Sequence, residues 1–294
     1  MKPPIFLGLS LTLCLATGVG MGMLDYGVIE SQNMSSYKSM LVNSSVELSS
    51  YRFLMEMEMK MDQIDLLNQT EPPQNIFIRT LAAGGFNQSN KSMKMVMAQL
   101  VVPAGDEGNS SALALEEYIL NDTVYVKVDG NWTAFRLREP NLWAQQDQAR
   151  QQMELLNRSE MALLGSEAVD GQDCYRIRVV PEMRSYARVA EEQLGPYVGH
   201  LNVSQFYKNS AMDVVYWVSK KDNLLTKTEM FMTFNLTSES LGATARGPDS
   251  GEMHMAIHLI FRFMDFNQVV RDLPPAEATG IDVAELNLTS MEWM

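Results

Sequence analysis

Apolar and polar residues alternate in the segment YRFLMEMEMKMDQI at positions 51–64. The apolar side chains recur at every second position: Phe53, Met55, Met57, Met59 and Met61. Because successive side chains of a β-strand point to opposite faces, this period of two predicts a strand with one apolar and one polar face. Methionine is not a favoured strand residue, so its concentration on one face requires an explanation.

The same alternation recurs in three later segments. Their apolar positions are Met93, Met95 and Met97; Met230, Met232 and Phe234; and Met253, Met255, Ile257, Leu259, Phe261 and Phe263. If these segments share one sheet with their apolar faces aligned, thioethers and aromatic rings line a single surface. From these segments and the first strand we take Phe53, Met55, Met57, Met59, Met61, Met93, Met95, Met97, Met230, Met232, Phe234, Met255, Ile257 and Leu259 as candidate lining residues.

Turn residues divide the rest of the chain into hairpins. Asp129-Gly130 and Asp170-Gly171 stand between alternating runs, which is typical of a tight β-turn. We therefore expect three short strands within 114–138, a hairpin within 165–182, a second hairpin within 214–237 that turns at 221–223, and a further strand at 254–266.

Helical periodicity is limited to a few segments: 142–157, the weaker 183–198, and a Ser-rich stretch within 27–49. The sequence thus predicts a mainly β protein built on one antiparallel sheet of about nine to eleven strands. A few helices remain to cover one face of that sheet.

Length and composition are those of a folded protein. The chain has 294 residues, of which 46% are hydrophobic and 20% charged, enough for one large domain. The formal net charge of -13 argues against nucleic acid as a partner and against anionic headgroups bound through a basic surface.

The first 24 residues have the layout of an export signal, with one Lys, a long apolar run and then small residues. We expect this segment, 1–24, to be either a signal or a membrane anchor. It is followed by a Ser/Asn-rich leader at 25–50, a half-barrel domain at 51–280 and a tail at 281–294. Since Cys14 lies in the export segment, Cys174 is expected to be a buried free thiol in the mature chain.

Asparagines support export. The chain has 17 Asn, of which 12 begin an Asn-x-Ser/Thr triplet, whereas chance predicts about two. These candidate glycosylation sites are Asn33, Asn43, Asn68, Asn87, Asn90, Asn109, Asn121, Asn131, Asn157, Asn202, Asn235 and Asn287. We expect an N-glycosylated protein that is extracellular or exposed at the cell surface.

An ordered series of short patterns resembles the lipoprotein-carrier (LolA/LppX-like) half-barrel superfamily, and in particular the exported surface proteins of prokaryotes. The patterns are Ser50-Tyr51-Arg52-Phe53, Val124-Tyr125-Val126-Lys127 with Gly130-x-Trp132, Leu164-Gly165 before Gly171-x-x-Cys174-Tyr175, Trp217-Val218-Ser219-Lys220, Phe263-x-Asp265-Phe266-Asn267 and Leu273-Pro274-Pro275-Ala276-Glu277-Ala278. The resemblance implies a strongly curved antiparallel sheet whose concave side is closed by helices around an apolar cavity for acyl chains.

Three interpretations of the methionine-lined face remain open. It is a plain core in which Met fills irregular gaps, a deformable pocket for lipid chains, or a Cu(I) site. The Met runs contain no Cys and only His254 and His258, which on a strand lie about 13 Å apart. We therefore expect no metal and no cofactor.

No enzymatic motif is present: the sequence contains no HExxH, no GxSxG and no phosphate-binding Gly loop. Paired carboxylates such as Glu116-Glu117 are interpreted as solvated charges. The sequence predicts a non-enzymatic protein that binds a lipid or another apolar molecule and is membrane-associated if the N-terminal segment is retained. The alternative is a structural or interaction component of the envelope with a filled core and no ligand.

Overall fold

The computed structural model describes residues 34–46, 48–63, 74–103, 110–137, 147, 156, 159–181, 210–237, 252–268, 273–281 and 283–286. The N-terminal segment and the expected helix at 183–198 lie outside these residues. Of the expected helix at 142–157, only Asp147 and Leu156 are described.

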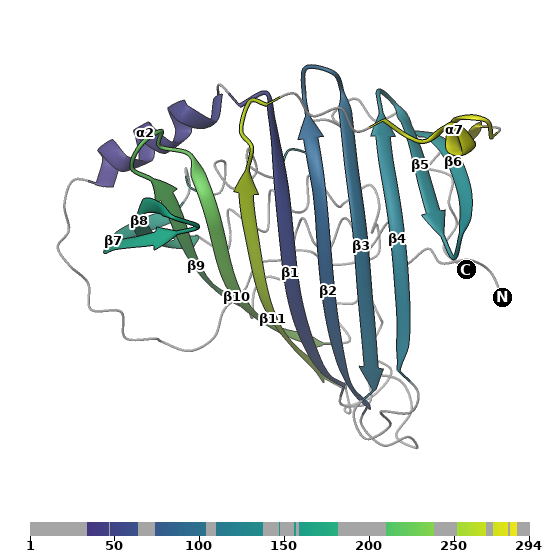
Figure 1. The fold of residues 1–294 in the computed structure, drawn as a ribbon. Coiled ribbons are helices and arrows are strands. Elements are labelled where there is room, and N and C mark those ends of the chain that lie inside the picture. The colour runs from purple at the N-terminus through teal and green to yellow at the C-terminus, as the bar shows by residue number, and fades with distance from the viewer. Residues whose placement is uncertain are drawn as a thin grey trace.

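The described strands form one sheet (Figure 1). The strands are β1 (Ser50–Gln63), β2 (Gln74–Asn87), β3 (Ser92–Pro103), β4 (Ser111–Leu120), β5 (Thr123–Val128), β6 (Asn131–Leu137), β7 (Ser159–Val169), β8 (Gln172–Pro181), β9 (Ser210–Ser219), β10 (Leu225–Thr237), β11 (Glu252–Met264) and β12 (Val283–Leu286). Their order in the sheet is β12-β6-β5-β4-β3-β2-β1-β11-β10-β9-β8-β7. The prediction of one antiparallel sheet is confirmed for β1 to β11.

β12 was not predicted. It pairs with β6 in parallel, from Val283 opposite Ala134 to Leu286 opposite Leu137, and raises the number of strands to 12. These residues fall in the segment 281–294 that was expected to be a tail. A four-residue strand at the sheet edge has too short an alternation to be recognised from sequence.

Two meanders make up the sheet. Strands β1 to β6 follow one another in chain order on one side, and β7 to β11 do so on the other. The two halves meet where β1 pairs with β11, from Arg52 opposite Met264 to Gln63 opposite Met253. The long Met-bearing strand β1 therefore lies in the interior of the sheet, with β2 on its other side.

The predicted Asp-Gly turns are confirmed. Asp129 and Gly130 have φ values of 49° and 81°, and Asp170 and Gly171 have 48° and 80°. Positive φ at both central residues of a two-residue turn matches the right-handed twist of the flanking strands. These turns join β5 to β6 and β7 to β8, and they set the register of both hairpins.

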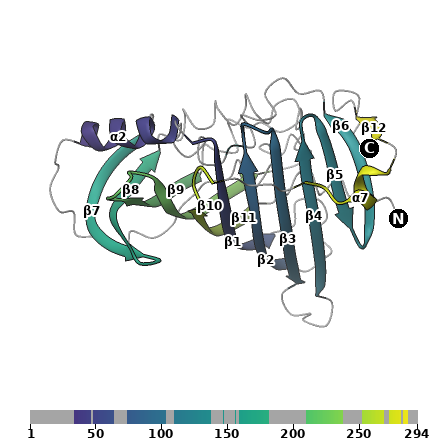
Figure 2. The same cartoon turned by 45° about the horizontal axis from the view of Figure 1, so that its top comes forward.

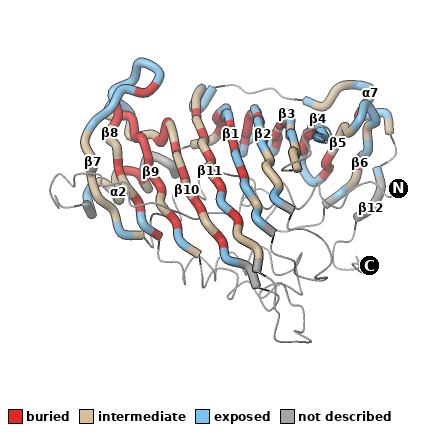
Figure 3. The backbone as a smooth tube through the Cα atoms, turned by 90° about the horizontal axis from the view of Figure 1, so that it is seen from below, coloured by how far each residue is buried: buried red, intermediate tan, exposed pale blue. Residues whose placement is uncertain are grey.

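The two faces of the sheet differ in burial. Along β1, Phe53, Met55, Met57 and Met59 are buried, and the residues between them are exposed. Figure 3 shows this alternation of buried and exposed positions along the strands. We call the side that carries these four residues the inner face, and the opposite side the outer face.

Helix α2 (Met34–Val46) covers part of the inner face. Its Leu41 is fully buried in the same apolar cluster as the Met residues, and its Tyr37 makes an edge-to-face contact with Tyr175 of β8 at 5.2 Å between ring centroids. Figure 2 shows the β7 end of the sheet curving round towards α2, so the inner face is concave there. This helix was expected within 27–49, and its position is confirmed.

The second described helix, α7 (Ala276–Thr279), packs on the outer face. Glu277 accepts a hydrogen bond from Nε1 of Trp132 at 3.1 Å and pairs with Nζ of Lys127 at 3.5 Å. α7 therefore lies outside the concave side, in addition to α2, which covers part of it as expected. Among the described residues, no helix is both long and apolar enough to cross a membrane.

The outer face is less polar than the alternation predicted. Leu54, Leu81 and Val96 lie on neighbouring strands of this face with about 44–45% of their surfaces exposed. Charged side chains such as Arg52 and Glu58 surround them, in the ion pairs Arg52–Asp265 and Arg79–Glu58, each at 3.9 Å. The sequence pattern gives the side of each residue but not the polarity of its neighbours on adjacent strands.

Gly84 makes room for an aromatic ring on the inner face. It lies opposite Phe53 on β1 and Met95 on β3. A Cβ at this position would stand 2.6 Å from Cζ of Phe53 and would also meet the carbonyl oxygen of Lys94. The ring of Phe53 therefore extends across β2, where any other residue would displace it.

We predict that Gly84→Ala destabilises the fold by about 1–3 kcal/mol, because the added methyl group overpacks this contact. The measurement is the free energy of unfolding in urea. Gly280→Ala is the matched control: a Cβ there lies 3.5 Å from the carbonyl oxygen of Ala276, an ordinary contact. Equal stability of Gly84→Ala and the wild type would show that Phe53 does not need this space.

Candidate functional site

The residues expected to line a cavity all lie on the inner face. Those with less than a tenth of their surface exposed are Phe53, Met55, Met57, Met59, Met93, Met95, Met97, Met230, Met232, Phe234, Met255, Ile257 and Leu259. Met61, near the end of β1, is half-buried and packs against the same cluster. The structure thus brings the candidate residues together; their binding of a ligand stays a prediction.

Strand registers place these side chains in rows across the sheet. One row runs from Met230 through Leu259 and Met57 to Thr80 on four successive strands. A second runs from Phe261 through Met55 and Ala82 to Met97 and Leu115. Residues paired in register share a face, so the inner face is continuous from β10 to β4.

Aromatic rings gather where β1, β2 and β11 end. Tyr51 lies 5.3 Å from the ring of Phe86 and 5.6 Å from that of Phe263, measured between centroids. Its hydroxyl donates a hydrogen bond to Oδ1 of the buried Asp147 at 3.3 Å. The three rings border this end of the Met-lined surface. The hydroxyl of Tyr51, the one polar group on these rings, has Asp147 as its hydrogen-bond acceptor.

Among the described strand residues, buried polar side chains interrupt the inner face at three places. Nε2 of Gln99 donates to Oγ1 of the fully buried Thr80 at 3.2 Å, so these two satisfy each other. Thr228 is also fully buried, and its Oγ1 has no hydrogen-bond partner. The third is Glu117 on β4.

Glu117 was expected to be a solvated charge, and the structure contradicts this. Only 6% of its surface is exposed, and it lies opposite Met95 on β3 and Val126 on β5. Burial raises the pKa of its carboxyl group from 4.5 to about 7, because an apolar environment disfavours the charged form. The sequence signal was available: Leu115, Glu117 and Ile119 alternate, so Glu117 takes an apolar position.

Glu116 is the neighbour that behaves as expected. It faces outward, pairs with Nζ of Lys94 at 3.8 Å and accepts a hydrogen bond from the hydroxyl of Tyr118 at 2.8 Å. Adjacent residues of one strand thus have opposite environments. This contrast makes Glu116 a natural control for Glu117.

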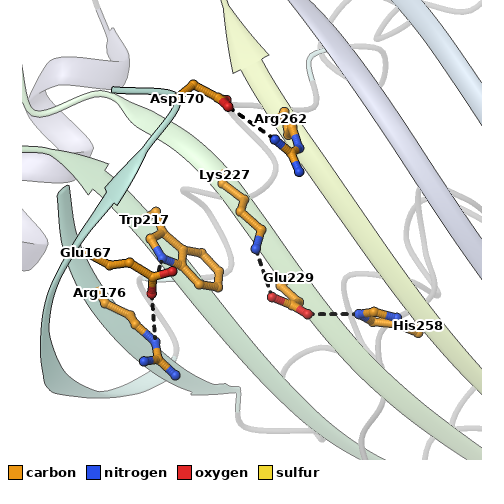
Figure 4. A network of polar contacts seen from close by, with 8 residues as sticks. All are labelled: Glu167, Asp170, Arg176, Trp217, Lys227, Glu229, His258 and Arg262. Atoms are coloured by element: carbon orange, nitrogen blue, oxygen red, sulfur yellow. Dashed lines mark hydrogen bonds and ion pairs between the residues drawn. The ribbon is translucent and has the colours of Figure 1, made fainter. Parts of the chain in front are cut away.

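A network of charged and aromatic side chains covers the outer face of β7 to β11 (Figure 4). Lys227 lies over the ring of Trp217 at 3.9 Å, and Glu229 contacts both Nζ of Lys227 and Nε2 of His258 at 3.0 Å. Burial opposes ionisation of Glu229, but the hydrogen bonds and charges of Lys227 and His258 outweigh it and lower its pKa. The network accounts for these groups without a ligand.

The two histidines and the cysteine each have a hydrogen-bonding contact within the protein. His254 and His258 have separate partners, since Nδ1 of His254 contacts Oδ1 of Asn235 at 2.6 Å. Cys174 is fully buried, unpaired among the described cysteines, and 3.5 Å from Oγ1 of Thr226. No cluster of three potential ligands (His, Cys, Asp or Glu) occurs within the described ranges.

A cavity of about 340 Å³ lies beside the β7–β8 and β9–β10 turns and the end of β11. Its lining mixes apolar and polar groups: Val169, Asp170, Gln172, Asp222, Thr226, Phe263, Met264, Asp265, Phe266 and Gln268. The candidate lining residues do not border it. It meets the inner face at Phe263, which belongs to the main apolar cluster.

Of the candidate glycosylation sites, six asparagines have described side chains. Asn43, Asn90, Asn121, Asn131 and Asn235 are exposed. Asn87 differs, with 6% of its surface exposed and its Oδ1 accepting the backbone N–H of Asn90 at 3.0 Å. Asn33, Asn68, Asn109, Asn157, Asn202 and Asn287 lie outside the described residues.

The buried carboxyl group predicts a pH-dependent stability. The folded state retains the proton of Glu117 between the unfolded pKa of 4.5 and the folded pKa of about 7. The stabilisation is therefore complete below about pH 4.5 and is lost as the pH rises through about 7, by about 3 kcal/mol in all. Glu117→Gln should remove this loss, so that the variant is more stable than the wild type at about pH 8.

Urea unfolding at about pH 4.5 and about pH 8 measures this difference. Glu116→Gln, on the outer face, should keep the wild-type profile. Parallel profiles for Glu117→Gln and the wild type would contradict the raised pKa.

Comparison with known proteins found similar solved structures. The chain is similar to LprF from Mycobacterium bovis, with 12% identity over 82% of this chain and 98% of that chain, at a TM-score of 0.42. It is similar to the lipoprotein LppX of Mycobacterium tuberculosis, with 11% identity over 82% and 99% of the two chains at a TM-score of 0.38. A lipoprotein-sorting protein domain from Vibrio parahaemolyticus has 11% identity over 82% and 96%, at 0.23.

No family model and no curated protein matches the chain. The matched solved structures include one named as a lipoprotein and one named as a lipoprotein-sorting domain. Since their TM-scores are low, the function proposed below rests on the sheet of this chain and not on these matches.

Proposed function

We propose that this chain is an exported, N-glycosylated cell-surface protein that binds or carries a lipid, or another long apolar molecule, on the inner face of its sheet. The observation that carries the proposal is the concentration of methionine there. The buried methionines of the main apolar cluster are Met55, Met57, Met59, Met93, Met95, Met97, Met212, Met230, Met232 and Met255.

Methionine favours binding of flexible ligands. Its side chain is unbranched and polarisable, so it adjusts to apolar partners of different shape, whereas β-branched residues fix one shape. Strands are ordinarily filled with Val, Ile and aromatic residues, and β9 follows that rule with Val214, Tyr216 and Val218 on its inner face. β1 departs from it at the inner positions from Met55 to Met61, and β3 at those from Met93 to Met97. This departure supports a deformable surface in the middle of the sheet.

Long-chain apolar molecules fit the extent of the surface. From β10 to β4 the rows cross five strand spacings, about 24 Å at about 4.8 Å each. A molecule lying along a row would contact side chains of several strands at once. Aromatic rings around Tyr51 border the surface at one end of β1.

A structural component of the cell envelope, without ligand, is the second candidate. The observation that favours it is the low exposure of the inner face, where Met57 has 4% and Met232 has 1% of the surface exposed. A filled core gives such values, because protein interiors are close-packed. The two candidate functions differ in one measurable property: a lipid-binding protein takes up an apolar probe at the inner face, and a structural component with a filled core does not.

Substitution at Met57 tests the binding proposal. We expect the wild-type chain to bind a fluorescent fatty-acyl probe saturably and Met57→Glu to bind it at least about tenfold more weakly, because an ionised carboxylate in an apolar site loses hydration without gaining a partner. Probe titration and thermal unfolding are measured together. Glu58→Gln changes the adjacent, outward-facing residue and should leave binding unchanged.

Met57→Ile is a milder variant for the case in which Met57→Glu does not fold. A volume-conserving exchange costs less than about 1.5 kcal/mol of stability. The stiffer side chain should still lower the affinity of the protein for the probe. A folded wild-type chain that neither binds the probe nor carries a co-purifying lipid in native mass spectrometry would leave the structural candidate.

Glycosylation makes a separate prediction. Peptide mapping of protein from its native source should find glycans among Asn43, Asn90, Asn121, Asn131 and Asn235, whose side chains are exposed. Asn87 should remain unmodified, because its buried amide oxygen is engaged with the backbone of Asn90. Absence of glycans from all five exposed sites would refute the surface-glycoprotein part of the proposal.

A further inference from the structure

Glu117 is a carboxyl group without a partner on the inner face. It forms no hydrogen bond or ion pair among the described residues, and 6% of its surface is exposed. The side chains nearest to it in register are apolar: Met95 on β3 and Val126 on β5, with Leu115 and Ile119 two residues away on its own strand. Burial of a carboxyl group to this extent without a counter-charge is costly, because it removes most of its hydration.

Cationic side chains of the neighbouring strands are directed away from it. Lys94 of β3 is held on the outer face by Glu116 and lies over the ring of Tyr118 at 5.1 Å. Lys127 of β5 is held there by Glu277 and lies over the ring of Trp132 at 5.3 Å. The protein thus places its local cations on one side of the sheet and this carboxyl group on the other.

Glu117 lies in a row of the inner face between buried apolar residues on one side and more exposed residues on the other. The row runs from Phe263 through Phe53, Gly84 and Met95 to Glu117, and then through Val126 to Thr133. Burial decreases along its last part, since Val126 is half-buried and Thr133 is exposed. Glu117 therefore stands between the Met-lined surface and the more open β6 end of the inner face.

We propose that Glu117 is the anchor for the polar head of an amphiphile, specifically a primary-amine head whose apolar chain lies over Met95 and Phe53. The inference rests on the function proposed above and names the ligand class of the same surface. An ammonium group supplies the counter-charge and the N–H donors that the neighbouring side chains do not, and charge-assisted hydrogen bonds of this kind are about twice as strong as neutral ones. A carboxylate head would meet a like charge.

The ionisation of Glu117 makes anchoring dependent on pH. Burial raises its pKa to about 7, so the carboxyl group is mostly ionised at about pH 8 and mostly protonated at about pH 5. The register neighbours on β3 and β5 carry no titratable group on this face. On the inner side of β1, three strand spacings away, the described titratable groups are Tyr51 and Asp147, which are hydrogen-bonded to each other.

Binding of three probes with one chain length tests the proposal: dodecylamine, dodecanol and dodecanoate, each below its micellar concentration, with the full chain. At about pH 8 the wild type should bind dodecylamine about tenfold more tightly than dodecanol, and dodecanoate more weakly than both. Glu117→Gln, which keeps the shape of the side chain, should abolish the preference for the amine and leave dodecanol binding unchanged. Glu116→Gln should keep the preference.

The outcomes separate this inference from the proposed function. Lowering the pH to about 5 should reduce the amine preference of the wild type but not alter that of Glu117→Gln. Binding of dodecanol with an amine preference that survives Glu117→Gln, or with no amine preference in the wild type, overturns the anchor and leaves the apolar surface. Binding of none of the three probes by folded wild-type protein overturns both.

Discussion

The pairing of β1 with β11 is the interaction on which the rest of the structure depends. All other antiparallel ladders join strands that follow each other in the chain, whereas this one joins residues about 200 positions apart, such as Phe53 and Phe263. Beyond its end, the backbone N–H of Asn267 donates to the carbonyl of Ser50, and Oδ1 of Asn267 accepts the N–H of Ser49, each at 2.8 Å. Without this ladder the two meanders would expose two long strand edges, and their apolar faces would not align.

Alignment of the meanders creates a surface that neither half has alone. Met57 contacts Leu259 of one half and Thr80 of the other through adjacent ladders. The side chains on this surface are mainly flexible thioethers in the middle of β1 and β3, and mainly branched or aromatic groups on β9. The sheet thus combines an adaptable middle with a more rigid flank covered by α2. This distribution is the physical basis of the binding function that we propose.

Glu117 shows what such a surface does to a charged group. The same residue on the outer face would be solvated and paired, as Glu116 is with Lys94. On the inner face, burial stabilises its neutral form and raises its pKa to about 7. A chain selected only for stability would place an apolar residue there, because burial of an unpaired carboxyl group opposes folding above that pH. The presence of Glu117 therefore lowers the stability of the fold above that pH, and by our proposal it binds the polar head of a ligand.

Local patterns in the sequence determined most of the strands, their faces and most turns, but they identified neither β2 nor β12. Period-two alternation assigns Met55, Met57 and Met59 to one side, because the strand geometry allows no other arrangement, and Asp129-Gly130 specifies its turn through positive φ at both residues. Tertiary structure alone decided that β1 pairs with β11, that β12 extends the sheet beside β6, and that α7 packs on the outer face. It also decided the environment of Glu117, since the sequence gives its side of the strand, while the apolar character of that side depends on Met95 and Val126 of neighbouring strands. Contacts between strands are set by the packing of the whole sheet, and a linear pattern does not contain them.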